Sequence, residues 1–161
     1  MDCRNVELTG IRLLDLPFLL MSGLDRERIG VQYPEQEWLK QFRIAPLRYF
    51  NRSTRLRSFI ILVDGRRAGY VGLNPLSENI EYYLQPWARG GAGKRAVTEF
   101  LRRTLPSVRD EHAFMLPGNE RSVMTFRRSL EALRLREDAD FEYFTYDGGS
   151  GFRVIAGSTS R

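Results

Sequence analysis

A glycine-rich run, Arg89-Gly90-Gly91-Ala92-Gly93-Lys94, holds the residues of this sequence best suited to binding a phosphate group. It lies between a strand-like and a helix-like segment. Glycine has no Cβ, so the main chain can approach a ligand closely. The first N–H groups of a helix, the positive end of its dipole and the charges of Arg89 and Lys94 all favour an anion here. The alternative is a sharp strand-to-helix turn that binds nothing, for which glycines alone would suffice.

Two familiar phosphate-binding motifs do not fit this run. A nucleotide P-loop requires glycine at its first position and Ser or Thr after the lysine, where this sequence has Ala88 and Arg95. A dinucleotide-binding fold places its glycines after the first strand of a βαβ unit, whereas several strand-like segments precede residue 89. The third candidate ligand is the diphosphate of an acyl-coenzyme A.

The sequence resembles the GNAT N-acetyltransferase superfamily in two motifs. Residues 84–97 resemble the family's central motif, Gln/Arg-x-x-Gly-x-Gly/Ala after a strand that ends near a proline. Residues 119–128 resemble the second motif, an Asn followed on one helix by a small residue and then by Tyr or Phe. With the order of elements, the resemblance covers about residues 6–156. It implies transfer of an acetyl group from acetyl-CoA to a primary amine by direct attack in a ternary complex, without a covalent enzyme intermediate.

The sequence also departs from the family pattern. Placing Gly91 and Gly93 on the motif glycines puts Ala88 where Gln or Arg is usual. Starting the motif at Arg89 instead puts other residues at both final glycine positions. Phe126 occupies the position where many relatives carry a tyrosine thought to protonate the departing thiolate. A catalytically silent coenzyme A-binding relative is therefore an alternative.

The resemblance implies a set of cofactor-binding residues drawn from the strand end, the glycine-rich run and the second motif. They are Leu84, Arg89, Gly90, Gly91, Ala92, Gly93, Lys94, Asn119, Ser122 and Phe126. For Asn119, a role as the N-cap of the helix that follows is an equally good explanation.

Catalysis by such an enzyme requires a base, because an amine with a pKa near 10.4 is protonated at neutral pH. We assign this role to Glu81, acting directly or through water; the alternative is an ordinary solvated carboxylate. The resemblance implies that a main-chain N–H near Tyr83 or Leu84 faces the thioester oxygen. Tyr83 is the second catalytic candidate, as one of four tyrosines that could replace the absent acid: Tyr82, Tyr83, Tyr143 and Tyr146.

Hydrophobic periodicity predicts the elements that position these residues. Strands are expected at 6–13 with a bulge or bend at Gly10, and at 59–63, 68–73, 80–84, 112–116, 141–146 and 152–156, with the turn Asp64-Gly65 and a flexible tip at 147–151. Helices are expected within 15–33, after Pro34 and ending before Pro46, from the glycines to Pro106, and after Asn119. This order predicts an α+β fold in a single domain spanning residues 1–161. The fold expected is GNAT-like: a mixed, largely antiparallel central sheet of about six to seven strands with flanking helices, in three α/β/α layers.

The composition limits the kinds of partner and the compartment that we expect for this protein. No segment has the roughly 18 apolar residues needed to span a membrane, and the start lacks an apolar signal core, so we expect a cytoplasmic protein with no membrane contact. One Cys and one His provide no metal-ligand cluster. The net charge is +5, but the arginines are spread along the chain, so we expect no nucleic acid; an arginine-rich nucleic-acid-binding module, supported by residues 49–52, is the alternative. The expected acceptor is a small-molecule or peptide amine, bound between 15–33 and 147–151. A homodimer is left open.

Overall fold

The computed structural model describes residues 5–23, 44, 46–76, 79–104, 112–115, 119–137, 139–146 and 149–156. Four strands form an antiparallel sheet in chain order: β1 (Val6–Gly10), β2 (Ser58–Val63), β3 (Arg66–Leu73) and β4 (Ile80–Leu84). The predicted turn between β2 and β3 is confirmed, since Asp64 and Gly65 have φ values of 50° and 76°. Positive φ at both central residues is typical of a tight hairpin.

Of the bulge or bend predicted at Gly10, the structure has no bulge, and the strand predicted to continue to Leu13 stops at this glycine. β1 ends at Gly10, and the chain leaves the sheet through a short 3-10 helix, Leu13–Asp15. The Asp15 carboxylate accepts a hydrogen bond from the Arg12 main-chain N–H at 2.8 Å, which stabilises this new turn. The irregularity in this part of the sheet lies instead in β2, between Ile61 and Leu62.

Three further strands form a second antiparallel sheet: β5 (His112–Met115), β6 (Ala139–Tyr146) and β7 (Gly149–Ala156). The order is β5-β7-β6, so β7 is central. The tip predicted at 147–151 is wrong, because residues 149–151 belong to β7, while 147–148 lie outside the described residues. Gly151 serves packing, because a Cβ there would lie 2.5 Å from the Phe144 ring, and Gly149 has a φ of 137°.

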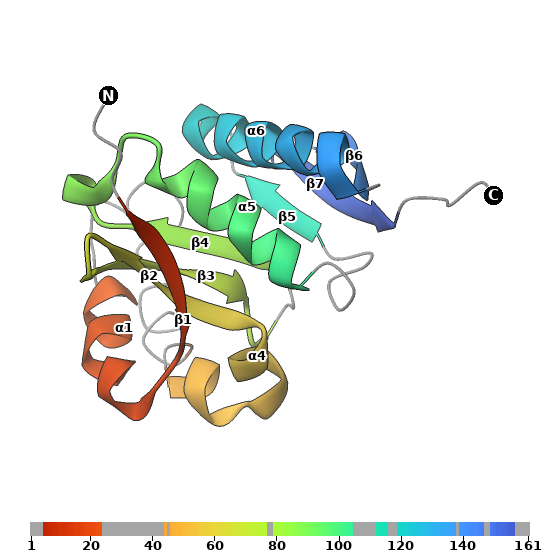
Figure 1. The fold of residues 1–161 in the computed structure, drawn as a ribbon. Helices are drawn as coiled ribbons and strands as arrows, with labels where there is room; N and C mark the ends of the chain where they lie inside the picture. Colours follow the sequence, from red (N-terminus) through yellow and green to blue (C-terminus); the bar gives the residue numbers. More distant parts are fainter. Residues whose placement is uncertain are drawn as a thin grey trace.

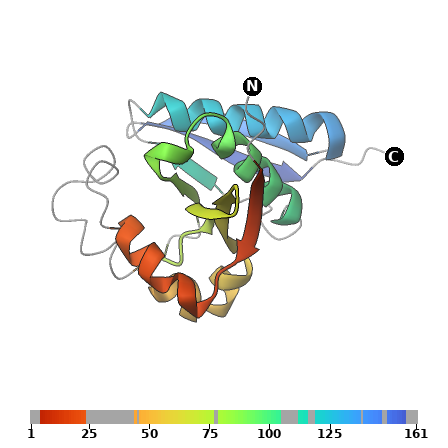
Figure 2. The same ribbon diagram turned by 60° about the vertical axis from the view of Figure 1, so that its left-hand side comes forward.

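Helices cover both sides of the first sheet (Figures 1 and 2). α5 (Ala92–Thr104) and α6 (Glu120–Glu137) lie on one side, and α1 (Leu16–Gly23) and α4 (Arg52–Leu56) on the other. The predicted mixed α+β fold in three layers is confirmed, although its strands divide into two sheets. Of the helices in the described part of the chain, none is long and apolar enough to cross a bilayer.

Residues 46–50 are also helical, so the predicted helix end before Pro46 is wrong. The helix core predicted from Trp38 to Phe42 lies outside the described residues. Sequence reasoning missed α4, a five-residue helix capped by Asn51, whose side chain accepts a hydrogen bond from the Thr54 N–H at 3.2 Å.

Two hydrophobic cores share β4. The larger core lies under α5 and α6 and includes Ile80 and Leu84 of β4. The smaller core lies on the opposite face and includes Tyr83 of β4 with Leu19 of α1. Successive side chains of a strand point to opposite faces, so the five residues of β4 contribute to both cores.

Candidate functional site

The glycine-rich run forms the turn from β4 into α5. β4 is followed by a 3-10 helix, Pro86–Ala88, and α5 then begins at Ala92. Between them Gly90 and Gly91 have φ values of 106° and 101°, a conformation that other residues rarely adopt. A Cβ on Gly93 would lie 3.3 Å from the Leu84 side chain, so the start of α5 packs closely on β4. The backbone conformation thus favours glycine at Gly91, and the close packing leaves little room for a side chain at Gly93.

The first main-chain N–H groups of α5 are available to a ligand. Helix geometry leaves the first N–H groups without an acceptor inside the helix. The N–H of Arg95 donates to the Gly91 carbonyl at 3.3 Å. Within the described part of the chain, no acceptor is found for the N–H groups of Ala92, Gly93 and Lys94. Together with the helix dipole, these amides form a site that favours an anion.

One edge of β4 is open. Gln85 donates its N–H to the Ala68 carbonyl at 2.8 Å, and Tyr83 lies opposite Tyr70 in the same register. The main-chain groups of odd-numbered residues therefore face β3, and those of Tyr82 and Leu84 face the other edge. Beyond that edge lies β5 (Figure 1), which belongs to the other sheet. Among the described strands, none forms a ladder with β4 along this edge.

Four predicted cofactor-binding residues meet beside this edge, on the side of α5 and α6. The side chain of Leu84 packs against the start of α5 at Gly93. From the same face of β4, the Tyr82 hydroxyl lies 3.4 Å from the Ser122 Oγ, and the Tyr82 ring lies 5.7 Å from that of Phe126. Tyr82 was predicted only as one of four alternative acids. Because side chains alternate along a strand, its position two residues before Leu84 indicates that both lie on the same face of β4.

Phe126 is a core residue as well as a neighbour of this site. Its side chain is 3% exposed, and its ring stacks on that of Phe152 with centroids 6.3 Å apart. The predicted cap of α6 is confirmed, since the Asn119 Oδ1 accepts a hydrogen bond from the Ser122 N–H at 3.3 Å. Arg89 and Lys94 are exposed near the start of α5, where their charges add to those of the amides.

The two predicted catalytic residues lie on the other face of β4. Tyr83 is buried in the smaller core, with its ring 6.0 Å from that of Tyr70. The structure therefore does not bring Tyr83 together with the cofactor-binding residues. Glu81 forms an ion pair with Arg48, which sequence reasoning missed. No local sequence pattern predicts this ion pair, because 33 residues separate Arg48 from Glu81.

The predicted acceptor-binding segments are only partly described. Residues 16–23 form α1, beside the smaller core, while 24–33 lie outside the described residues. Residues 149–151 are part of β7 rather than a loop. Tyr143, on β6, lies with its ring 5.7 Å from the guanidinium of Arg127.

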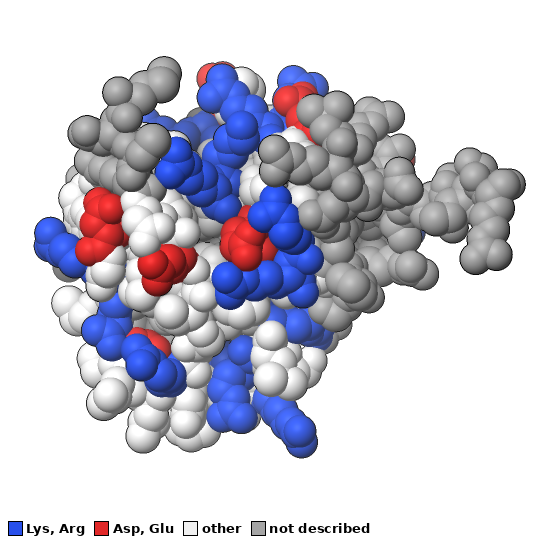
Figure 3. Space-filling model, viewed as in Figure 1, with Lys and Arg blue, Asp and Glu red and all other residues white. Residues whose placement is uncertain are grey.

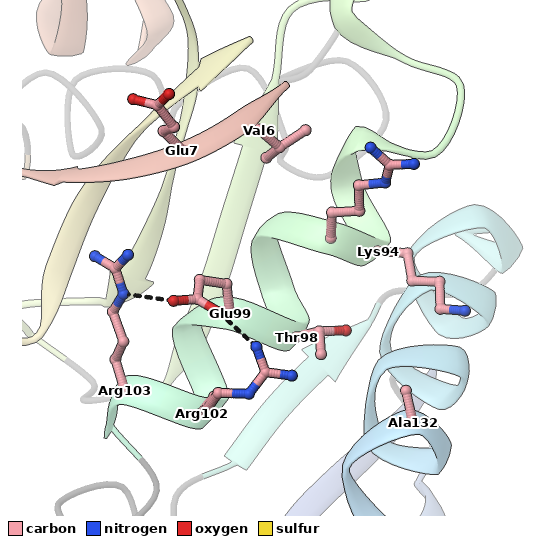
Figure 4. Close-up of a pocket in the computed structure, with 9 residues that line it drawn as sticks. Val6, Glu7, Lys94, Thr98, Glu99, Arg102, Arg103 and Ala132 are labelled. Atoms are coloured by element: carbon pink, nitrogen blue, oxygen red, sulfur yellow. Dashed lines mark hydrogen bonds and ion pairs between the residues drawn. The ribbon is translucent and has the colours of Figure 1, made fainter. Parts of the chain in front are cut away.

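A cavity of about 520 Å³ lies on the outer side of α5 (Figure 4). Its lining consists of Val6, Glu7, Lys94, Arg95, Thr98, Glu99, Arg102, Arg103 and Ala132. Only Lys94 belongs to the predicted site. Glu99 accepts hydrogen bonds from Arg103 at 2.8 Å and Arg102 at 2.7 Å, which hold the pKa of Glu99 below its ordinary value of 4.5.

Acidic and basic side chains lie side by side on this face of the molecule (Figure 3). The carboxylate of Glu99 thus compensates part of the positive charge around the cavity. The start of α5 and the open edge of β4 offer main-chain groups without protein partners in the described residues, whereas only Lys94 of the cavity lining contributes such an amide. We therefore place the candidate site at the junction of β4 and α5.

No family model and no curated protein matches the sequence. Solved structures match along nearly the whole chain. The ribosomal L7/L12 alpha-N-protein acetyltransferase RimL has 14% identity and a TM-score of 0.60, covering 94% of this chain and 90% of its own. The Vibrio cholerae spermidine N-acetyltransferase, solved with CoA and spermine, has 12% identity, a TM-score of 0.59 and coverage of 95% and 96%.

AAC(6')-Ib, solved with acetyl-CoA, has 19% identity and a TM-score of 0.57, covering 98% of both chains. All three share the arrangement of elements described above. At these identities the likeness concerns the fold. Together with the glycine turn into α5 and the lack of a ladder between the described strands β4 and β5, these matches show that the chain has the GNAT N-acetyltransferase fold.

Proposed function

We propose that this protein is an acetyl-CoA-dependent N-acetyltransferase that transfers an acetyl group to a primary amine by direct attack in a ternary complex. One observation carries the proposal: the start of α5, whose first amides have no acceptor in the described part of the chain, packs on Leu84 at the end of β4, and none of the described strands pairs with the outer edge of β4. A ligand with a diphosphate and an extended arm matches this juxtaposition of an anion site and a free strand edge. Two of the matched enzymes were solved with CoA or acetyl-CoA.

The residues at the junction suit the parts of coenzyme A. The amides of Ala92, Gly93 and Lys94 would bind the diphosphate, aided by the charge of Arg89. The open edge of β4 would receive the amide-containing pantetheine arm, beside a second group of residues on α5, on α6 and at the cap of α6. That group consists of Gly93, Asn119, Ser122 and Phe126.

In the reaction, the nitrogen lone pair of the neutral amine attacks the thioester carbonyl carbon and the C–S bond then breaks. Glu81 accepts the proton lost by the amine, directly or through water. The main-chain N–H of Leu84, which faces the open edge, stabilises the oxyanion of the tetrahedral intermediate. We assign protonation of the departing thiolate to Tyr82 rather than Tyr83, because only the Tyr82 hydroxyl lies on the face of the cofactor-binding residues.

A catalytically silent coenzyme A-binding protein is the second candidate. It is favoured by Phe126, which fills a core position with no hydroxyl. An amine acceptor, whether a small molecule or a peptide, is part of the proposal. The single domain, the cytoplasmic location and the homodimer stay predictions of the sequence.

Calorimetric titration with acetyl-CoA, followed by an assay of thiol release with a panel of polyamines and peptides, tests the proposal. We expect saturable binding and amine-dependent release of free coenzyme A. Binding without release for any amine would leave the silent binder. No heat at millimolar acetyl-CoA would overturn both candidates.

The substitution Glu81→Gln tests the assignment of the base. We expect kcat to fall about 100-fold, because general-base catalysis contributes at least that much, with an unchanged Kd for acetyl-CoA. The matched control is Glu142→Gln, an exposed glutamate on β6. Full activity of Glu81→Gln would remove Glu81 from the mechanism.

A further inference from the structure

Arg48 is the largest side chain that is fully buried among the described residues. It is 2% exposed, although arginine is almost never buried without a partner. Burying a guanidinium carries a desolvation cost that its ion pair only partly offsets, and an apolar side chain of similar size stabilises a core equally well or better. Packing alone therefore gives no reason for an arginine at this position.

Three contacts fix the Arg48 guanidinium over strands β3 and β4. One terminal nitrogen donates to the Leu73 carbonyl at 3.1 Å, and the other donates to the Glu81 carboxylate. The guanidinium carbon lies 4.4 Å from the centre of the Tyr70 ring. A planar group held at both ends and on its face has little freedom to move, so it transfers this rigidity to the carboxylate.

Glu81 differs from Arg48 in its access to solvent. Its side chain is 16% exposed, against 2% for Arg48. The carboxylate is thus held by a buried guanidinium and is itself partly exposed to solvent. A general base requires this combination, since it must keep one orientation and still reach the proton that it removes.

We infer that Arg48 is a positioning residue, which fixes the Glu81 carboxylate for removal of the acceptor amine's proton. The inference rests on the proposed function and deepens it. Arg48 touches neither reactant. It acts through Glu81 by holding the carboxylate in one rotamer.

A double-mutant cycle on kcat tests the inference with Arg48→Met, Glu81→Gln and the variant that carries both. Arg48→Met is expected to lower kcat about tenfold with KM for acetyl-CoA unchanged. In the Glu81→Gln background the same change is expected to lower kcat less than about twofold, because the group that it positions is already lost. Losses that multiply would show that Arg48 acts independently of Glu81 and would overturn the inference.

Two further variants separate positioning from folding. Arg48→Lys retains the charge but cannot contact the Leu73 carbonyl and Glu81 together, so its kcat is expected between those of wild type and Arg48→Met. Arg52→Met, at an exposed position of α4, is expected to keep wild-type kcat. If Arg48→Met does not fold, the double variant can be used instead, because it buries no unpaired charge. Its kcat is then compared with the kcat of Glu81→Gln alone. A large further loss in a folded double variant would contradict the inference.

The outcome is separable from that of the proposed function. A wild-type protein that neither binds acetyl-CoA nor releases thiol would refute the function and the inference together. A wild-type protein that is active, with independent effects of Arg48 and Glu81, would refute the inference alone.

Discussion

The two faces of β4 are built in different ways. On the side of α5 and α6, apolar side chains such as Leu84 and Phe126 fill one large core, and the main chain at its border is free of protein partners in the described residues. On the side of α1, the core is small and lies beside an ion pair between Arg48 and Glu81. The first arrangement leaves an opening for a ligand. The second fixes a charged group.

The two faces of β4 therefore have different roles. Apolar packing is non-directional, so the α5 side can bring a helix start and a strand edge together without using polar side chains. An ion pair is directional and sets the orientation of a carboxylate. Four substitutions test the contrast, beginning with the largest expected effect.

Phe126→Ala is expected to lower the free energy of unfolding by about 4 kcal/mol, because it opens a cavity between Tyr82 and Phe152. Urea denaturation measures the change. The control is Phe50→Ala, whose side chain is 68% exposed and whose removal is expected to cost less than about 1 kcal/mol. Similar losses for both would show that the larger core does not depend on this ring.

Arg48→Met alone is expected to lower the free energy of unfolding by about 3 kcal/mol, because Glu81 then stays partly buried without its counter-charge. Adding Glu81→Gln is expected to restore most of this loss in the same denaturation assay. In an apolar core, a second truncation does not restore the stability lost by the first. Recovery of stability in the double variant therefore distinguishes the ion pair from the larger apolar core. A double variant less stable than Arg48→Met would contradict this description.

Gly91→Ala is expected to raise the Kd for acetyl-CoA about tenfold, measured by calorimetry. A side chain at φ 101° costs on the order of 1–3 kcal/mol, which the turn can relieve only by moving the amides that follow it. Gly10→Ala is the control, since a Cβ there meets no atom within 4 Å. An unchanged Kd would mean that the turn does not bind the cofactor.

Glu99→Gln, on the outer side of α5, is expected to reduce stability by about 0.5 kcal/mol at pH 7, as is usual for exposed ion pairs. Arg103 and Arg102 lower the pKa of Glu99, so the wild type gains this stability above pH 4.5 and loses it as the pH falls through the lowered pKa. Denaturation at pH 7 and at pH 3 measures the difference. A stability difference between wild type and Glu99→Gln that is larger at pH 3 than at pH 7 would contradict this pH dependence.

Sequence reasoning succeeded where the determining contacts are local. The turn Asp64-Gly65, the strand 80–84 and the cap at Asn119 each depend on residues within a few positions. It failed where distant contacts decide. The glycines at 149 and 151 indicated a loop, but Gly151 makes room for a ring from β6.

The candidate site shows the same division. The glycine turn could be located because helix starts and positive φ values have a sequence signature. The faces of Tyr82 and Tyr83 could not be assigned, because both sides of β4 are covered and an alternating pattern does not say which core is which. Arg48 could not be found, since only the folded chain brings it to Glu81.

The position of β7 bears on how the protein is made. This strand comes last among the described elements, yet it lies between β5 and β6. During synthesis, β5 and β6 therefore leave the ribosome without their hydrogen-bonding neighbour, and their unsatisfied edges stay exposed until residues 149–156 emerge. The second sheet can close only after residues 149–156 have been synthesised, so until then the nascent chain carries two unpaired strand edges.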